Sequence, residues 1–174
     1  MDAIFRHNVE DRKPQVSYNI SGEHGELVVE YPEIGGSIPA DPAVVMEWNL
    51  LFSNTVPIDL EIQTSAGNSE LNLKTLNLTG LHIDVSAGTT VVDLTNALDH
   101  DLRATITGGF ADITVNLPKE MGVQVSGDTD LGELTDAGLR KDGNVYVNEF
   151  YGNSPPTLFL DIDAGVGDIH LLTP

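Results

Sequence analysis

Three carboxylates lie within six residues of one another in the segment SGDTDLGE, residues 126–133: Asp128, Asp130 and Glu133. Calcium takes about six to eight oxygen ligands and often draws several of them from one short acidic loop. The segment therefore predicts a calcium site. It lacks the full spacing of an EF-hand loop and has no helical pattern beside it, so a solvated turn explains the same residues and stays open as an alternative.

A second set of acidic residues emerges when the chain is aligned with itself. The equivalent positions hold Glu26, Glu70, Asp112, Glu133 and Asp168, with Val91 as the apolar exception. In parallel stacked strands, residues of one column lie about 4.8 Å apart. Carboxylates at that distance repel, so the column predicts a site for calcium or for a basic partner. An outward position that is simply kept polar beside a turn explains the column equally.

Other reactive chemistry is sparse in this chain. It has no cysteine, which excludes disulfides, thiol nucleophiles and cysteine-based zinc sites. The five histidines show no zinc-binding spacing, and neither a nucleophile elbow nor a P-loop is present. A polysaccharide-cleaving β-helix needs two carboxylates across a groove, whereas strand alternation places Asp161 and Asp163 on one outward face. We therefore expect no enzymatic activity, and we predict no catalytic residue.

The charge balance narrows the classes of partner. The 174 residues include 27 acidic and 8 basic side chains, for a formal net charge of −19. Nucleic acids and anionic membranes are bound by concentrated Lys and Arg, so neither is an expected partner. No apolar run approaches the roughly 20 residues that a membrane-spanning helix needs. We expect no direct membrane span in this chain.

The elements that position these side chains form a repeat. The stretch LHIDVSAGTTVVDL aligns with others upstream and downstream at a spacing of 21 residues. In each copy, two stretches of period-2 alternation indicate half-buried strands. Small residues between them allow a sharp bend. The copies are residues 16–29, 60–73, 81–94, 102–115, 158–171 and, with a lengthened corner, 123–134.

This repeat predicts a single all-β domain over residues 1–174. A bent strand pair cannot bury its apolar face alone, but stacked copies can, so we expect a β-solenoid of about six to seven coils. An antiparallel β-sandwich of ordinary hairpins is the alternative. Residues 1–57 would hold the first coil and an irregular Trp-containing segment, and residues 58–174 the regular repeat.

A stacked sheet has two open ends that must be covered to prevent edge-to-edge growth. The region around Trp48 and the C-terminal copy, residues 158–171, are the candidate caps. An end that is left uncovered would allow self-association.

Four segments in order, DLEIQTSAGNSELNL, NLTGLHIDVSAGTTVVDL, ITGGFADITVNLP and VYVNEFYGNSPPTLFLDIDAGVGDIHLL, resemble the toast-rack domain. That domain is grouped with LiaF-like C-terminal domains and β-repeat adhesins of bacteria. The resemblance is close over residues 47–172, and the preceding part resembles the family's N-terminal extension. It implies an all-β repeat fold in a cell-envelope protein, membrane-associated or extracytoplasmic through segments outside this chain. It carries over no catalytic residue.

The residues and the resemblance together predict a non-enzymatic recognition or scaffold module. Its partner would be another envelope or membrane-associated protein, or a second copy of the chain. The resemblance links such a module to envelope-stress sensing or adhesion. The competing interpretation is a calcium- or carbohydrate-binding module that uses the acidic column, and a polysaccharide-cleaving enzyme is the third.

Overall fold

The computed structural model describes residues 1–8, 13–31, 46–153 and 156–174. Every helix or strand in these ranges is a β-strand, so the all-β prediction is confirmed. The chain divides into two compact units, Met1–Ser53 and Asn54–Pro174. The boundary lies close to residue 57, where the sequence pattern places the start of the regular repeat. That the two units act as a single domain stays a prediction.

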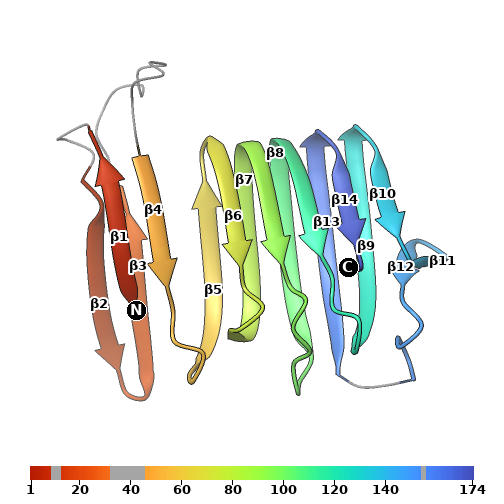
Figure 1. Ribbon diagram of the computed structural model, residues 1–174, viewed down its shortest axis with the longest axis horizontal. Helices are drawn as coiled ribbons and strands as arrows, with labels where there is room; N and C mark the ends of the chain where they lie inside the picture. Colours follow the sequence, from red (N-terminus) through yellow and green to blue (C-terminus); the bar gives the residue numbers. More distant parts are fainter. Residues whose placement is uncertain (9–12, 32–45, 154–155) are drawn as a thin grey trace. The chain divides into compact units, whose positions relative to one another are not determined.

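The first unit holds two antiparallel strand pairs in its described residues (Figure 1). Residues 16–29, predicted as a coil of the stack, instead form a hairpin in which Ser21 pairs with His24. Its turn contains Gly22 at φ 64°. Small residues between alternating stretches fit a tight hairpin as well as a coil corner, so this part of the prediction is wrong. The pairs are β1 (Asp2–His7) with β4 (Met46–Leu51) and β2 (Gln15–Ser21) with β3 (His24–Glu30).

Trp48, on β4, joins an aromatic cluster within the first unit. Phe5 meets its ring edge-on, with 5.8 Å between ring centroids, and Tyr31 lies at 4.6 Å. The predicted role of Trp48 as a cap of the repeat stays a prediction. Residues 32–45 of the same segment lie outside the described residues.

The second unit is a ten-stranded mixed sheet built from bent arcs (Figure 1). Each arc has a first leg, a corner and a second leg, and neighbouring arcs pair in parallel along both legs. In the order of pairing, arc 1 is β5 (Pro57–Thr64) and β6 (Gly67–Asn72), arc 2 is β7 (Asn77–Asp93), arc 3 is β8 (Leu102–Asn116), arc 4 is β13 (Thr157–Val166) and β14 (Ile169–Leu172), and arc 5 is β9 (Gly122–Leu131) and β10 (Leu134–Ala137).

The C-terminal copy lies inside the stack. Leu158 pairs with Leu102 of β8 on one side and with Val123 of β9 on the other. The chain therefore passes through arc 5 before it returns to occupy arc 4. The prediction that this copy caps the repeat is wrong. β12 (Val145–Val147) lies antiparallel to β9 and in turn pairs with β11 (Arg140–Asp142).

The spacing between arcs is not constant. Arcs 1 and 2 are offset by 21 residues, as predicted, but Leu81 pairs with Ala104, which is 23 residues further on. A shift of two residues leaves the same side chains facing inward, because strand alternation has a period of two. The corner columns shift with it, and Gly88 pairs with Ala111 rather than Gly109.

The core of the second unit lies between the two legs of each arc. The alternation of buried side chains changes phase at every corner, so that apolar side chains of both legs turn inward. The legs approach closely, since a Cβ added at Gly127 on β9 would lie 2.6 Å from Leu134 Cδ1 on β10. Burial of these side chains from water stabilises the arcs collectively. Fully buried members include Ile83, Val85, Val92, Ile106, Ile113, Val115, Val123, Ile162, Ile169 and Leu171.

Candidate functional site

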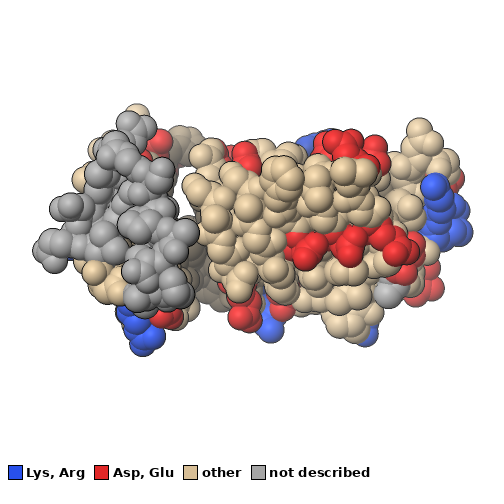
Figure 2. All heavy atoms as spheres, turned by 90° about the horizontal axis from the view of Figure 1, so that it is seen from above, with Lys and Arg blue, Asp and Glu red and all other residues tan. Residues whose placement is uncertain are grey.

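Three of the five predicted column residues form one row across arcs 3, 4 and 5. Ile169 pairs with Ile113 on one side and with Leu134 on the other, which aligns the residues that precede them. We call these the acidic row: Asp112, Asp168 and Glu133. Viewed from above, acidic side chains form a continuous band along this face of the second unit (Figure 2).

Backbone amides hold two of the three carboxylates of the acidic row. The Asp168 amide donates to Asp112 Oδ1 at 3.0 Å, and the Glu133 amide donates to Asp168 Oδ1 at 2.9 Å. Each aspartate thus accepts the peptide N–H of the next arc at the point where the chain turns. Such charge-assisted bonds stabilise the corner without neutralising the carboxylates. The carboxylates of Asp112 and Asp168 are therefore held in place, and the row carries negative charge.

The other two predicted members lie elsewhere. Glu26 sits on β3, opposite Asn19 of the hairpin in the first unit. Glu70 pairs with Val91, two residues beyond the column that contains the acidic row. The 23-residue offset between arcs 2 and 3 causes this displacement. Val91 is consequently not a gap in the acidic row. In arcs 1 and 2 the column continues with the neutral residues Asn68 and Thr89.

A second row, which the sequence reasoning missed, runs beside the acidic one. Val166 pairs with Phe110 of arc 3 and with Leu131 of arc 5. We call these three residues the apolar row. Their exposed fractions are 38% for Val166, 71% for Phe110 and 69% for Leu131. Single exposed apolar side chains are normal, whereas several that adjoin one another form the kind of patch that marks contact surfaces.

The two rows arise from one local pattern. Each of the three arcs carries an apolar residue, a small residue and an acidic residue in succession at its corner. The signal was available in the sequence as FAD at residues 110–112, VGD at 166–168 and LGE at 131–133. The shared pattern can be recognised only when arc 4 is known to lie between arcs 3 and 5. In arc 2 the same positions hold AGT, at residues 87–89.

Small residues separate the rows because the backbones touch there. Gly167 has φ 137°, and a Cβ at that position would lie 2.1 Å from the Ala111 carbonyl oxygen. At Gly132 the corresponding distance to the Gly167 carbonyl oxygen is 1.9 Å. Only glycine fits such an approach between neighbouring backbones. The rows are therefore carried on a tightly stacked backbone.

The predicted calcium ligands Asp128, Asp130 and Glu133 do not form a loop. The first two lie on the exposed side of β9, and Glu133 follows the corner. Asp128 Oδ1 accepts the amide of Thr129 at 2.9 Å. In the described parts of the chain, no three histidine or carboxylate side chains converge as metal ligands do. Calcium binding by these residues stays a prediction, and the geometry gives it no preformed site.

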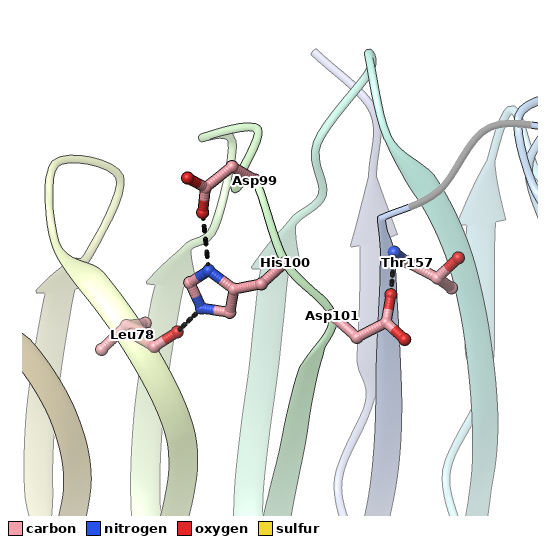
Figure 3. A network of polar contacts seen from close by, with 5 residues as sticks. All are labelled: Leu78, Asp99, His100, Asp101 and Thr157. Carbon is pink, nitrogen blue, oxygen red and sulfur yellow. Dashed lines mark hydrogen bonds and ion pairs between the residues drawn. The ribbon is translucent and has the colours of Figure 1, made fainter.

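A histidine lies between two acceptors in the connection from β7 to β8 (Figure 3). His100 Nδ1 is 2.8 Å from Asp99 Oδ1, and Nε2 is 2.8 Å from the Leu78 carbonyl oxygen. A neutral imidazole donates from only one nitrogen, so both bonds favour the protonated ring. The hydrogen bond to Asp99 and the one to Leu78 accordingly raise the pKa of His100. The same contact lowers the pKa of Asp99.

The described surface has an open hollow of about 390 Å³, lined by residues 95–97, Leu117, Lys119, Glu120 and Pro174. An apolar cavity of about 10 Å³ lies among leucines near Met121, which is room for no more than one water molecule. Asp161 and Asp163, considered above for a cleavage mechanism, are exposed on the outward side of β13, as predicted. Acidic and apolar groups are thus held in neighbouring rows on the described surface.

The fold and these rows define a class: an all-β protein whose second unit is a stack of arcs with regular rows of outward side chains. The chain belongs to the toast-rack family. Residues 1–116 match the family described as the N-terminal domain of toast_rack, DUF2154. Residues 65–171 match the one described as cell wall-active antibiotics response LiaF, C-terminal. The predicted resemblance is thereby confirmed.

A crystal structure described as that of a "putative cell adhesion protein" from Clostridium sporogenes ATCC 15579 has the same fold. Its TM-score is 0.96 at 25% sequence identity, and the match covers 99% of this chain and 82% of that chain. No curated protein matches this chain. The matched families are not enzyme families, and they fit an envelope-associated module. The described residues include no helix that is long and apolar enough to cross a membrane.

Proposed function

We propose that the second unit is a β-solenoid that serves as a non-enzymatic recognition scaffold in a bacterial envelope protein. The observation that carries the proposal is the parallel, in-register pairing of successive arcs along both legs. Such pairing repeats outward side chains at about 4.8 Å over a buried core. Repeat proteins of this kind use extended, regular surfaces for binding.

Protein contact is the mode of action that the surface supports. The outward positions of the first legs hold mixed polar side chains, as in the row His82, Thr105 and Asp161. The corners of arcs 3 to 5 add exposed apolar groups. Interfaces combine apolar anchors with a polar rim in this way. A carbohydrate site would be expected as a groove with convergent polar groups, whereas the three carboxylates of the acidic row follow one another across successive arcs.

The cell envelope is the proposed location. One matched family is described by its response to cell wall-active antibiotics, and the crystal structure with the same fold is described as a cell adhesion protein. Both descriptions support an envelope location for this chain. We propose envelope-stress sensing or adhesion as the role, with a membrane-associated or extracytoplasmic protein as the partner.

The test is site-specific photo-crosslinking in the native bacterial host. A photoreactive residue is placed in turn at Asp161 on a first leg, Thr114 on a second leg and Phe110 at a corner. Binding predicts a discrete adduct with another protein in the envelope fraction from at least one position, and none without irradiation. Failure of all three positions, or release of soluble sugars from envelope polysaccharide by the purified chain, would contradict the proposal.

A further inference from the structure

We infer that the apolar row Phe110, Val166 and Leu131, together with the acidic row beside it, is a docking surface for a basic amphipathic helix of a partner protein. This inference rests on the proposed recognition function and names the surface and the chemistry of its occupant. The apolar row supplies the anchor, since its side chains are exposed and adjacent. The acidic row selects the charge of the occupant.

The dimensions suit a helix laid along the stack. Three arcs spaced at about 4.8 Å place the first and third residues of each row about 10 Å apart. On a helix, positions i and i+7 are about 10 Å apart, with i+3 or i+4 between them. One helical face could therefore align Lys or Arg with the three carboxylates. The adjoining face would place apolar side chains over the apolar row.

The carboxylates are free to pair with a basic occupant. Among the described residues, the ion pairs join Lys74 to Asp93 and Arg140 to Asp142, with others at Arg6 and His100, and none includes the acidic row. Arg103 lies over the Phe159 ring at 5.0 Å. The amide hydrogen bonds on the aspartates leave the charge in place.

A second copy of the chain is a poorer occupant. Its own acidic row would meet this one, and a net charge of −19 adds general repulsion between copies. Calcium is also a poorer occupant, because no three carboxylates in the described residues converge on one point. A basic helix satisfies the charge and the exposed apolar groups together.

The neutral corners of arcs 1 and 2 limit the surface. The position of the acidic row is taken there by Asn68 and Thr89, and Ala87 aligns with the apolar row. The docking surface thus spans three arcs and has a definite end. Because the charged and apolar positions are limited to three arcs, they would fix the position of the bound helix along the stack, as charge patterns do in other interfaces.

The test is a fluorescence anisotropy titration of the full chain with a labelled peptide of about 18 residues, or five helical turns. Its helix carries one leucine face and one adjacent lysine face. One control peptide has glutamate in place of lysine, and another has the same composition in scrambled order. Titration at about 0.15 M salt limits unspecific attraction.

Two matched variants locate the site. The first, D112N/D168N/E133Q, removes three charges and keeps the oxygens that accept the amide bonds. The control, D84N/D163N/D128N, removes three charges from the first legs, where Asp163 pairs with Asp128. Three exposed ion pairs predict about tenfold weaker binding for the first variant and less than about twofold for the control.

A third variant separates anchoring from charge. F110S/L131S is expected to weaken binding by about tenfold or more, while V56S/L172S, at apolar residues that are also exposed, leaves it unchanged. Equal losses in test and control variants, or equal binding of the scrambled peptide, would reduce the interaction to net charge and overturn the inference. Dimerisation that requires Phe110 would overturn it as well.

The two proposals can fail separately. Protein adducts from Asp161 or Thr114, but not from Phe110, together with no peptide binding would remove the docking surface and leave the recognition function standing. Peptide binding at the rows with no protein adduct in cells would contradict the recognition function instead. Amide chemical shifts of Gly132 and Gly167, which lie between the rows, identify the surface directly when the peptide is added.

Discussion

The first two arcs and the last three arcs of the second unit share a backbone design but differ in what their corners carry. A column of small residues continues through all five arcs, from Gly67 and Gly88 through Ala111 to Gly167 and Gly132. The flanking positions are small or neutral in arcs 1 and 2 and are apolar and acidic in arcs 3 to 5. The close stacking of the backbones requires small residues in this column, whereas the residues on either side of it are not restricted in this way.

The arcs also differ in chain order, and the largest expected effect tests that difference. Ile162, on arc 4, is 1% exposed and pairs with Ile106 and Gly127 on its two sides. Because the side chain is enclosed by arcs 3 and 5, Ile162→Ala should cost about 2–5 kcal/mol in the free energy of unfolding. Denaturant titration measures this. Ile20→Ala, at a residue 70% exposed, is the control and should cost well under about 1 kcal/mol.

A loss no larger for Ile162→Ala than for Ile20→Ala would mean that arc 4 is a loosely attached terminal copy. The position of the C-terminal copy inside the stack would then be contradicted.

The next effect concerns the column that the arcs share. A Cβ at Gly88 would lie 1.8 Å from the Gly67 carbonyl oxygen, at φ 124°. Gly88→Ala should therefore destabilise the second unit by about 3 kcal/mol or more. Gly143→Ala is the matched control, because φ is 63° there and nothing lies within 4 Å of the added Cβ. It should cost about 1 kcal/mol, and equal midpoints of unfolding for the two variants would argue against close stacking at the corners.

A smaller effect separates the structural and the charged roles of the acidic row. Asp168→Ala removes the acceptor of the Glu133 amide bond and should cost about 1 kcal/mol. Asp168→Asn keeps an oxygen in that place and should cost less than about 0.5 kcal/mol. Thermal or denaturant unfolding measures both. A similar loss for the two variants would assign the stability to the charge rather than to the hydrogen bond.

Much of this architecture was predictable from alternation and small corner residues. Strand periodicity identified both legs of arcs 1 to 5, because half-buried strands must alternate. It could not separate the hairpin around Gly22 from a coil corner, since both need small residues between alternating stretches. The spatial order of the arcs could not be predicted from the sequence either. Leu158 fits beside Leu102 and beside Val123 alike, and only the three-dimensional pairing reveals that it does both.

The candidate surface was predicted in part for a related reason. A constant spacing of 21 residues joined Glu70 to Asp112, and the two-residue shift of arc 3 separates them. The alignment of Asp112, Asp168 and Glu133 was predicted correctly, because the sequence separations between these residues equal those between the paired strands that carry them. The exposed apolar neighbours were overlooked because Phe110, read alone in an alternating strand, is equally consistent with a core residue.

A calcium titration tests whether the corner of arc 5 holds a metal ion. Binding at Asp128, Asp130 and Glu133 would raise the melting temperature in calcium above that in magnesium at equal ionic strength. The separation of these side chains along β9 and beyond the corner leads us to expect equal shifts, produced by screening of the net negative charge. Scanning calorimetry against an EDTA control decides. A calcium-specific rise that D128N/D130N abolishes would restore the metal site.

The smallest expected effect lies at the connection between the two groups of arcs. The raised pKa of His100 and the lowered pKa of Asp99 mean that their pair stabilises the fold above about 3.8 and below about 6.5, their ordinary values. The histidine's contribution is lost as pH rises through its raised pKa, and the aspartate's as pH falls through its lowered one.

Unfolding of His100→Gln at two pH values checks this. The stability difference from the natural chain should be larger at about pH 5.5 than at about pH 8.5, because the contribution of the charged ring is lost as pH rises through the raised pKa of His100. His82→Gln, at an exposed position on β7, is the control for the loss of a histidine outside this contact. If both variants lose stability equally at both pH values, the contact with the Leu78 carbonyl does not hold the protonated ring, and arcs 2 and 3 are joined by their strands alone.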